Sequence, residues 1–184
     1  MLFIQGGGAN VHDEWDEALV ASLRAALGDG FDVRYPRMPA EHDPSAATWV
    51  PAIRDEVAAL DEGAAVVGHS VGGTLLMHTL VQAAPPGRLG AIVLVATPFV
   101  GEGGWPPDEF ELPSHLGSRL PPGVPVHLFH GLEDDTVPPA HADLYARAIP
   151  GAEVHRLPGR DHQLGNDPRE VATLIRGLDH SVGW

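Results

Sequence analysis

Short apolar runs alternate with segments of helical spacing along this chain, and that alternation restricts its fold more than any other feature. Six runs are rich in β-branched or aromatic residues and predict strands at residues 2–5, 31–35, 64–68, 91–95, 126–129 and 153–157. Between most of them, apolar residues recur every three or four positions, as in Trp15, Leu19, Leu23 and Leu27. Strands that alternate with helices favour a mostly parallel, doubly wound α/β sheet, here of about six strands with helices on both faces.

One of the helical segments contains a proline. Val50, Ile53 and Val57 follow the helical rhythm around Pro51. Proline is tolerated in the first turn of a helix, where its missing amide has no partner to lose. We therefore expect Thr48 to cap this helix.

The composition excludes several classes of protein. The 184 residues include neither cysteine nor lysine, so disulfide frameworks, thiolate zinc sites, cysteine nucleophiles, Walker P-loops and Schiff-base chemistry are all excluded. Eleven basic against 25 acidic side chains give a net charge of −14, which repels phosphate backbones and anionic lipids. We expect no nucleic-acid partner and no membrane partner, and the sequence does not indicate whether a protein partner exists.

The composition also bears on where the protein is located in the cell and on how many domains it has. No stretch of about 20 apolar residues is present, and the first residues lack the basic flank and apolar run of an export signal. The absence of cysteine fits a reducing compartment. We expect a cytoplasmic protein whose residues 1–184 form a single domain.

The strongest chemical signal is the G-x-S-x-G pattern in residues 68–72. It lies between the apolar run 64–68 and the helical run that begins at Val71. A strand, a sharp turn and a helix in that order place the Ser70 hydroxyl at the carboxyl edge of the sheet. The amide of Val71, at the start of the helix, is then available to stabilise an oxyanion. Ser70 is the predicted nucleophile.

A serine nucleophile needs a base and an acid, and both follow later strands. The run 126–129 leads into a loop with three neighbouring acids, Glu133, Asp134 and Asp135. The run 153–157 leads into a loop that ends at His162. Catalytic groups of open α/β sheets gather at the carboxyl ends of the strands.

The position of each later histidine separates the candidates for the base. His141 falls in a predicted helix, His155 within a strand and His180 in the tail. His162 lies on a loop at the expected edge of the sheet, so it is the predicted base.

Residues 68–72, 131–138 and 159–162, with serine, acid and histidine in that order, resemble the α/β-hydrolase superfamily. The compact chain, whose segment after residue 95 is too short for a cap domain, is most similar to the small retinoblastoma-binding-protein-nine family of serine hydrolases. The resemblance implies a compact α/β-hydrolase fold without a cap domain. It also implies that Asp134 is the acid, because the family pattern H-G-x-x-D-x-x-V-P places the acid third after Gly131.

The loop after the first strand supplies the second oxyanion amide in this superfamily. We expect Gly7 to supply that amide here, with Gly8 as the alternative, although Gln5 stands where the superfamily usually has histidine. Five residues in this loop and in the proline-rich segment 96–124 are predicted to bind substrate, since long loops in compact domains are often functional: Asn10, Val11, His12, Phe99 and Trp105.

No cofactor and no metal site are expected. The glycine-rich loop has Val11 where the third glycine of a dinucleotide fingerprint would stand. His127 and His130 are three positions apart on one strand and so point to opposite faces. No H-E-x-x-H or comparable ligand spacing is present in the sequence.

The sequence therefore predicts a serine hydrolase that cleaves a small carboxylic ester, thioester or amide through an acyl-enzyme, with an apolar cleft for a small acyl substrate. Two alternatives remain open. The chain is a binding or regulatory module on a hydrolase fold, or an acyl transferase that uses the same triad. Fold alone does not decide between them.

Overall fold

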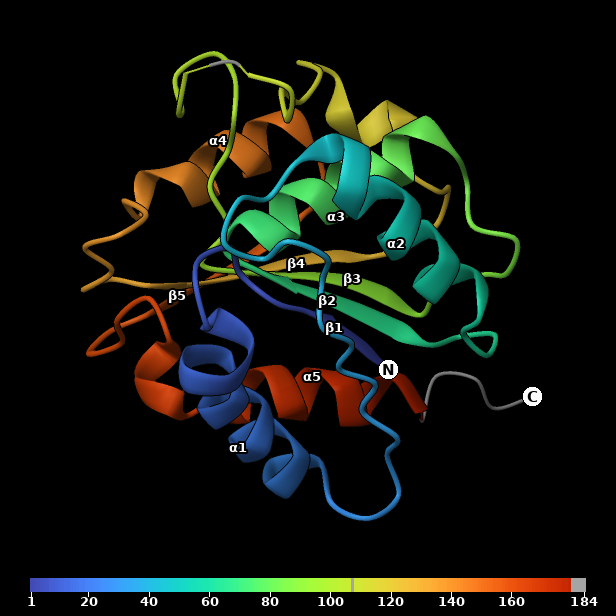
Figure 1. Ribbon diagram of the computed structural model, residues 1–184, viewed down its shortest axis with the longest axis vertical. Helices are drawn as coiled ribbons and strands as arrows, with labels where there is room; N and C mark the ends of the chain where they lie inside the picture. The colour runs from blue at the N-terminus through green and yellow to red at the C-terminus, as the bar shows by residue number, and fades with distance from the viewer. Residues whose placement is uncertain (107, 180–184) are drawn as a thin grey trace.

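The computed structural model describes residues 1–106 and 108–179, so His180 lies outside the described part. Its sheet contains five parallel strands in the order β1-β2-β3-β4-β5 (Figure 1). They span Leu2–Ile4 (β1), Ala65–His69 (β2), Ala91–Val95 (β3), Val126–Gly131 (β4) and Glu153–Leu157 (β5). The mostly parallel α/β fold predicted from the alternation is confirmed.

Helices cover both faces of the sheet, because the residues of β1, β2 and β3 are mostly apolar on both faces and are buried throughout. One face packs against α1 (Glu17–Leu27) and α5 (Arg169–Asp179), and the other against α2 (Ala46–Ala58), α3 (Val71–Gln82) and α4 (Ala140–Ala148) (Figure 1). Neighbouring strand residues alternate between the two cores: Val93 lies in the α1/α5 core, whereas Ile92 and Leu94 lie in the other. This is the two-residue period of a strand.

The predicted strand at 31–35 is wrong, and it is the reason that the sheet has five strands rather than six. The segment forms an isolated bridge between Arg34 and Leu2 beside β1. Pro36 has no amide to extend this pairing, and the carbonyl of Asp32 accepts from the N-terminal amine at 2.7 Å. The segment therefore covers the edge of β1 without forming a ladder.

Two helix starts also differ from expectation. Ser45 rather than Thr48 caps α2, because the Ser45 hydroxyl accepts from the Thr48 amide at 3.3 Å. Pro51 consequently lies inside the helix, beyond the first turn. Trp15 lies in a short π-helical segment, Val11–Asp16, and its side chain is 58% exposed instead of packing with Leu19 and Leu23.

The path of the chain predicts a crevice beside β1. After β1 the chain forms α1, passes Arg34 on the outer side of β1, and returns through α2 to β2 on the other side. The chain direction thus reverses around β1, and ligands of open α/β sheets bind outside the carboxyl ends of strands at such a point.

The long segment between β3 and β4 contains little regular structure. It holds a bridge between Val100 and Trp105 and one turn of 3-10 helix at Leu116–Arg119. Within the described ranges of the chain, every helix is too short or too polar to cross a bilayer.

Candidate active site

Ser70 occupies the sharp turn between β2 and α3. Its backbone angles are φ 51° and ψ −135°, and residues other than glycine rarely adopt a positive φ. Hydrogen bonds hold the turn on both sides, since the Ser70 amide donates to the Val95 carbonyl at 2.9 Å and the Ser70 carbonyl accepts from the Gly73 amide at 3.0 Å. Strained residues that the surrounding fold holds in this way cluster at functional sites.

The two flanking glycines of the pattern are required by close backbone contacts. A Cβ atom on Gly68 would lie 2.5 Å from Gly73 Cα, and one on Gly72 would lie 1.9 Å from the Gln5 carbonyl oxygen. Real Cβ atoms essentially never approach other atoms closer than 3.0 Å. Gly68 therefore lets the turn close on its own helix, and Gly72 lets that helix touch the loop after β1.

His162 lies between β5 and α5 and joins the serine to a carboxylate. Its Nε2 atom is 3.0 Å from Ser70 Oγ, and its Nδ1 atom is 2.9 Å from Asp134 Oδ2. When Nδ1–H donates to the carboxylate, Nε2 is left to accept from the serine hydroxyl. The structure thus brings the three predicted residues together in one hydrogen-bonded chain.

Asp134 is the member of the acidic cluster that faces His162. Its side chain is fully buried, whereas Glu133 and Asp135 are exposed. The loop after β4 turns around this carboxylate, because Asp134 Oδ1 accepts from the amides of Thr136 and Val137 at 2.9 and 2.8 Å. Sequence spacing alone leaves three candidates, and the turn selects one of them.

The surroundings of Asp134 keep it ionised. Burial acts to raise its pKa, but hydrogen bonds from His130, His162 and the Val137 amide outweigh burial and hold the pKa well below the usual range. His130 approaches Oδ2 at 3.2 Å and also faces the Val137 carbonyl at 2.8 Å. A charged carboxylate can therefore hold the Nδ1 proton of His162 at neutral pH.

A second buried histidine–carboxylate pair involves His69, the residue directly before the serine. His69 Nδ1 is 3.0 Å from the Asp16 carboxylate, and His69 Nε2 is 3.0 Å from the His162 carbonyl oxygen. Asp16 also accepts from the Gly6 amide at 2.7 Å and from Gln163 Nε2 at 3.2 Å. This one carboxylate therefore connects the loop after β1, the serine turn and the segment that carries His162.

The second pair is best described as two opposite charges. Burial acts to lower the pKa of His69, but the charge and hydrogen bond of Asp16 outweigh burial and raise it. Burial likewise acts to raise the pKa of Asp16, and His69 and the Gly6 amide reverse the effect and lower it. Both ring nitrogens of His69 face acceptors, so both must donate, which is the protonated form of the ring.

Two backbone amides near Ser70 are available for an oxyanion. Val71 begins α3, so its amide has no partner within the helix. The Gly7 amide likewise donates to none of the described residues, whereas the Gly6 amide is used by Asp16. A Cβ atom on Gly7 would lie 2.8 Å from Val71 Cγ1, so the two donor segments are in contact.

Gln5, the departure from the superfamily pattern, has a structural role. Its side chain is buried, accepts from the Met38 amide at 2.9 Å and donates to Glu41 at 2.7 Å. Gln5 thereby ties the loop after β1 to the segment before α2.

A cleft of about 360 Å³ opens at Ser70. Its lining residues come from the end of β2 and from the segments that follow β1, β2, β4 and β5: Gly6, Gly7, Val11, Trp15, His69, Ser70, Asp135, Thr136, Asp161, His162 and Gln163. Its position matches the crevice expected where the chain direction reverses around β1.

Of the five predicted substrate-binding residues, Val11 lines this cleft. Asn10 is exposed and donates to Glu14, and the His12 ring stacks on Tyr35 with 4.1 Å between ring centroids. Neither of these two side chains reaches the cleft lining, so the loop after β1 contributes fewer contacts than its length suggests.

Phe99 and Trp105 also lie away from the Ser70 cleft, contrary to expectation. Phe99 is buried against Tyr145, and the Trp105 ring lies edge-on to His141. Phe99 borders a separate cavity of about 880 Å³ between α3, α4 and the segment after β3. The aromatic residues of that segment thus pin it to α4 instead of covering the serine.

Several residues around the serine were not anticipated from sequence. Asp16, His69 and His130 form the buried polar contacts described above, and Trp15 and Gln163 line the cleft. His69 had a usable signal, because it directly precedes the serine in the G-x-S-x-G pattern. Asp16 lies in an ordinary amphipathic segment, where nothing local distinguishes a buried acid from an exposed one.

Comparison with known proteins gives a family match. A family model described as "Serine hydrolase" matches residues 2–166, a range that includes Ser70, Asp134 and His162. No curated protein matches the chain.

Several solved structures are similar over nearly the whole chain. The ydeN gene product of B. subtilis is 19% identical with a TM-score of 0.70, over 97% of both chains. The esterase domain of a Rhodothermus marinus protein is 20% identical with a TM-score of 0.67, over 98% of this chain and 85% of that one. CarC, a serine hydrolase involved in carbazole degradation, is 15% identical with a TM-score of 0.73, over 98% and 90%. At these identities the likeness shows the fold alone, and it confirms the predicted α/β-hydrolase fold.

Proposed function

Because this chain belongs to the serine hydrolase family, we propose that it hydrolyses a small carboxylic ester through an acyl-enzyme formed on Ser70. One observation carries the proposal: an unbroken hydrogen-bonded chain runs from Asp134 through His162 to Ser70 Oγ, at the wall of a cleft. A serine hydroxyl is a weak nucleophile until such a base removes its proton.

In the first half of the proposed reaction, Ser70 Oγ attacks the acyl carbonyl carbon while His162 Nε2 takes the hydroxyl proton. The Asp134 carboxylate stabilises the imidazolium that forms, through the hydrogen bond to Nδ1. His162 then returns the proton to the leaving alcohol oxygen as the carbon–oxygen bond of the ester breaks. The acyl group remains on Ser70.

The amides of Val71 and Gly7 are the proposed donors to the oxyanion of each tetrahedral intermediate. Neither amide donates to an acceptor among the described residues, which supports this role, since a donor already used within the fold would have to break a bond first. A single donor of this kind typically contributes about 3 kcal/mol to transition-state stabilisation.

In the second half, water replaces the alcohol. His162 Nε2 takes a proton from the water molecule, whose oxygen attacks the acyl carbon, and the same proton then passes to Ser70 Oγ as the acid leaves. The nucleophile and the base are thereby both restored.

The size and charge of the cleft favour a small ester that carries no negative charge. Ligand sites usually span about 300–1,000 Å³, so a cleft of about 360 Å³ suits a short acyl group. Asp135 and Asp161 contribute carboxylates to its lining, and no described arginine lies there to pair with an anionic substrate. An acidic substrate would therefore be repelled.

Labelling with a fluorophosphonate tests the nucleophile directly. The serine oxygen should form a bond to phosphorus as fluoride leaves, and intact-mass analysis with peptide mapping should place one adduct on Ser70. His162→Ala should prevent labelling, whereas Ser114→Ala, which removes an exposed serine outside the cleft, should not. A folded native chain that takes up no label, or takes it at another serine, would overturn the assignment.

A panel of neutral esters tests the substrate class. Acetyl and butyryl esters should have a higher kcat/KM than dodecanoyl esters of the same alcohol, because the cleft holds a short acyl group. Adding alcohols or thiols as competing acceptors measures how much acyl group goes to water, and release mainly as free acid supports a hydrolase over a transferase.

We also propose a cytoplasmic location and a single domain spanning residues 1–184. The absence of cysteine supports the location, because it fits a reducing compartment. Both hydrophobic cores pack against the two faces of one sheet, which supports the single domain. Limited proteolysis that releases a stable inner fragment would contradict the domain proposal.

A further inference from the structure

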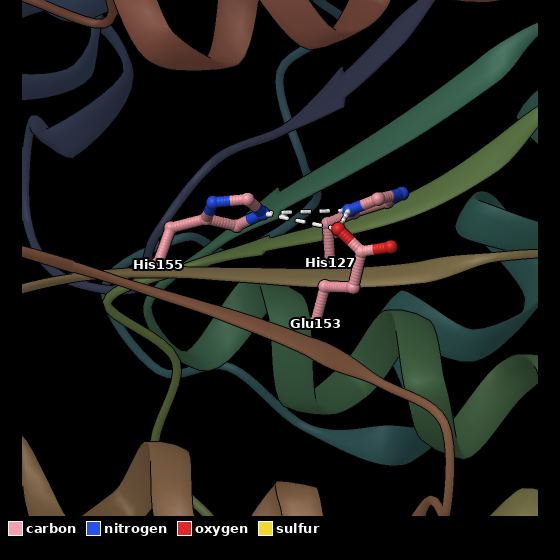
Figure 2. Close-up of side chains that lie close together, drawn as sticks. All are labelled: His127, Glu153 and His155. Atoms are coloured by element: carbon pink, nitrogen blue, oxygen red, sulfur yellow. Dashed lines mark hydrogen bonds and ion pairs between the residues drawn. The ribbon is translucent and has the colours of Figure 1, made fainter.

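Three side chains with metal-binding atoms meet on the α1/α5 face of the sheet, at the opposite end of its strands from Ser70. His127 is the second residue of β4, and Glu153 and His155 are the first and third residues of β5. His127 pairs directly with Glu153 in the strand register. Figure 2 shows the two imidazole rings and the carboxylate turned toward one another.

The distances between the candidate ligand atoms suit one small ion. His127 Nδ1 is 3.4 Å from His155 Nε2 and 3.6 Å from Glu153 Oε2, and the latter two atoms are 4.0 Å apart (Figure 2). A tetrahedral Zn²⁺ ion with bonds of 2.0–2.1 Å separates its ligand atoms by about 3.4 Å. The three atoms therefore form one face of a slightly expanded tetrahedron.

The surroundings keep two of these ligands in place. His127 is buried, so the surrounding side chains restrict its ring. The His155 ring lies flat on Phe129, with 4.2 Å between the ring centroids and 7° between the planes, which restricts its rotation.

We propose that His127, Glu153 and His155 bind one Zn²⁺ ion, with water in the fourth position. Two histidines and a glutamate are an established ligand set for zinc with one open position. The Glu153 and His155 side chains are 67% and 36% exposed, so solvent can reach the ion. The inference does not depend on the proposed hydrolase activity.

The position of the site indicates what the ion would do. Within residues 1–106 and 108–179, β5 is an edge strand that pairs only with β4. β5 leads to His162, and β4 leads to Asp134. An ion held by side chains of both strands adds a second connection between them, beyond the backbone hydrogen bonds, and stabilises the folded chain as any ligand of the native state does.

The test uses the full chain without a polyhistidine tag, stripped of metal by a chelator. Titration with Zn²⁺ against a chromogenic chelator should show one tight site per chain. The Tm should rise with Zn²⁺ concentration. Equal concentrations of Mg²⁺ or Ca²⁺ should leave the Tm unchanged, because these ions prefer oxygen ligands.

Variants identify the ligands. His155→Ala and Glu153→Ala should each weaken Zn²⁺ binding by at least about 100-fold, since removing even an outer-shell partner costs about 10- to 100-fold. Both side chains are partly exposed, so both variants should fold. His127→Ala tests the buried ligand in the same way, provided that this variant folds. His115→Ala, which removes an exposed histidine elsewhere, is the control and should bind as the native chain does.

Two results would overturn the proposal. One is a Zn²⁺ affinity in His155→Ala and Glu153→Ala equal to that of the native chain, which would assign binding to other surface histidines. The other is the lack of any Tm shift when Zn²⁺ saturates the native chain.

Discussion

Two histidine–aspartate pairs lie near Ser70, and they differ mainly in the atom that faces Nε2 of the ring. The Nδ1 atoms are 2.9 Å from Asp134 in His162 and 3.0 Å from Asp16 in His69. The Nε2 atom of His162 faces the Ser70 hydroxyl, whereas that of His69 faces the His162 carbonyl, each at 3.0 Å. The His162 side chain is 16% exposed and that of His69 is 1% exposed.

The comparison shows that the carboxylate on Nδ1 does not decide the role of the histidine. The group that faces Nε2 decides whether the ring can act as a base or only holds neighbouring segments in place. A nitrogen that faces a hydroxyl can accept the hydroxyl proton. A nitrogen that faces a carbonyl must donate, so the ring between a carbonyl and a carboxylate keeps both protons. We therefore expect His162 to exchange protons during turnover and His69 to hold the site together.

Removing either the nucleophile or the base should have the largest effect on activity. Ser70→Ala and His162→Ala should each lower kcat for a short-chain ester by about 10⁶-fold, because nucleophile and base act as one unit. Steady-state kinetics measure the loss, and Ser114→Ala should keep native turnover. Near-native activity in either variant would remove the distinction between the two pairs.

Asp134→Asn should have the next largest effect. The amide can no longer hold Nδ1–H of His162, so the ring favours the wrong tautomer and kcat should fall by about 10⁴-fold. The matched control is Glu133→Gln, which changes an exposed neighbouring acid outside the cleft lining and should leave kcat within a few-fold. If Glu133→Gln proves the more damaging substitution, the acid has been assigned to the wrong neighbour.

Asp16→Asn should affect stability more than chemistry. It leaves the buried, protonated His69 without its counter-charge, and breaking a buried ion pair costs about 3–5 kcal/mol. The Tm should fall by roughly 10 °C, at about 2–4 °C per kcal/mol for a chain of this length. The control is the exposed Asp61→Asn.

Asp16→Asn also distinguishes two roles for His69, which either positions His162 or transfers a proton itself. Misplacing His162 through the lost contacts of Asp16 should lower kcat by about 10- to 100-fold with little change in KM. The midpoint of the pH–rate profile should stay where the native chain has it, since the exchanging base is unchanged. A shifted midpoint would show that His69 takes part in proton transfer.

The pH dependence of stability is the smallest effect that we expect to separate the two pairs. Asp16 and Asp134 have lowered pKa values in the folded chain, so their contribution is present above about pH 4 and is lost as pH falls toward the folded values. The pKa of His69 is raised, so its contribution is present below about pH 6.5 and is lost as pH rises through the folded value.

Urea unfolding across this range measures both losses. Each pKa unit corresponds to about 1.4 kcal/mol. In Asp16→Asn, the loss of stability at rising pH should disappear and the loss at falling pH should become smaller. Asp61→Asn should show both losses as the native chain does. Identical profiles for these two variants would mean that Asp16 and His69 are uncharged in the folded chain.

The meeting of Ser70, Asp134 and His162 could be predicted because of a general property of parallel sheets. Each residue lies shortly after a strand, and the carboxyl ends of parallel strands share one edge. Which acid in the cluster faces His162 depended on a family pattern, because the turn that buries Asp134 has no signature in three consecutive acids. The catalytic roles of the three residues stay predictions until the variants are measured.

Other features depend on contacts that no local pattern encodes. His69 and Asp16 are 53 positions apart in the sequence. Phe99 and Trp105 are aromatic residues in a long loop, a pattern equally compatible with packing on α4 and with lining the cleft. The segment 31–35 has strand composition, but composition does not say whether a neighbour continues the ladder.

The cluster of His127, Glu153 and His155 shows the same limit. Sequence motifs for metal sites place their ligands within single segments, whereas these three ligands come from two strands. The three side chains come together only in the strand register that pairs His127 with Glu153. The apolar periodicity of the sequence does not determine this register.

Trp15 gives the chain a built-in optical reporter. Its indole is largely exposed and lines the cleft beside Ser70, while Trp49 is fully buried in the core. A ligand that enters the cleft changes the polarity around Trp15 and hence its fluorescence emission, and Trp15→Phe removes that response. Unlabelled esters can therefore be screened for binding by fluorescence in the inactive Ser70→Ala chain, without a coloured leaving group that biases the choice of substrate.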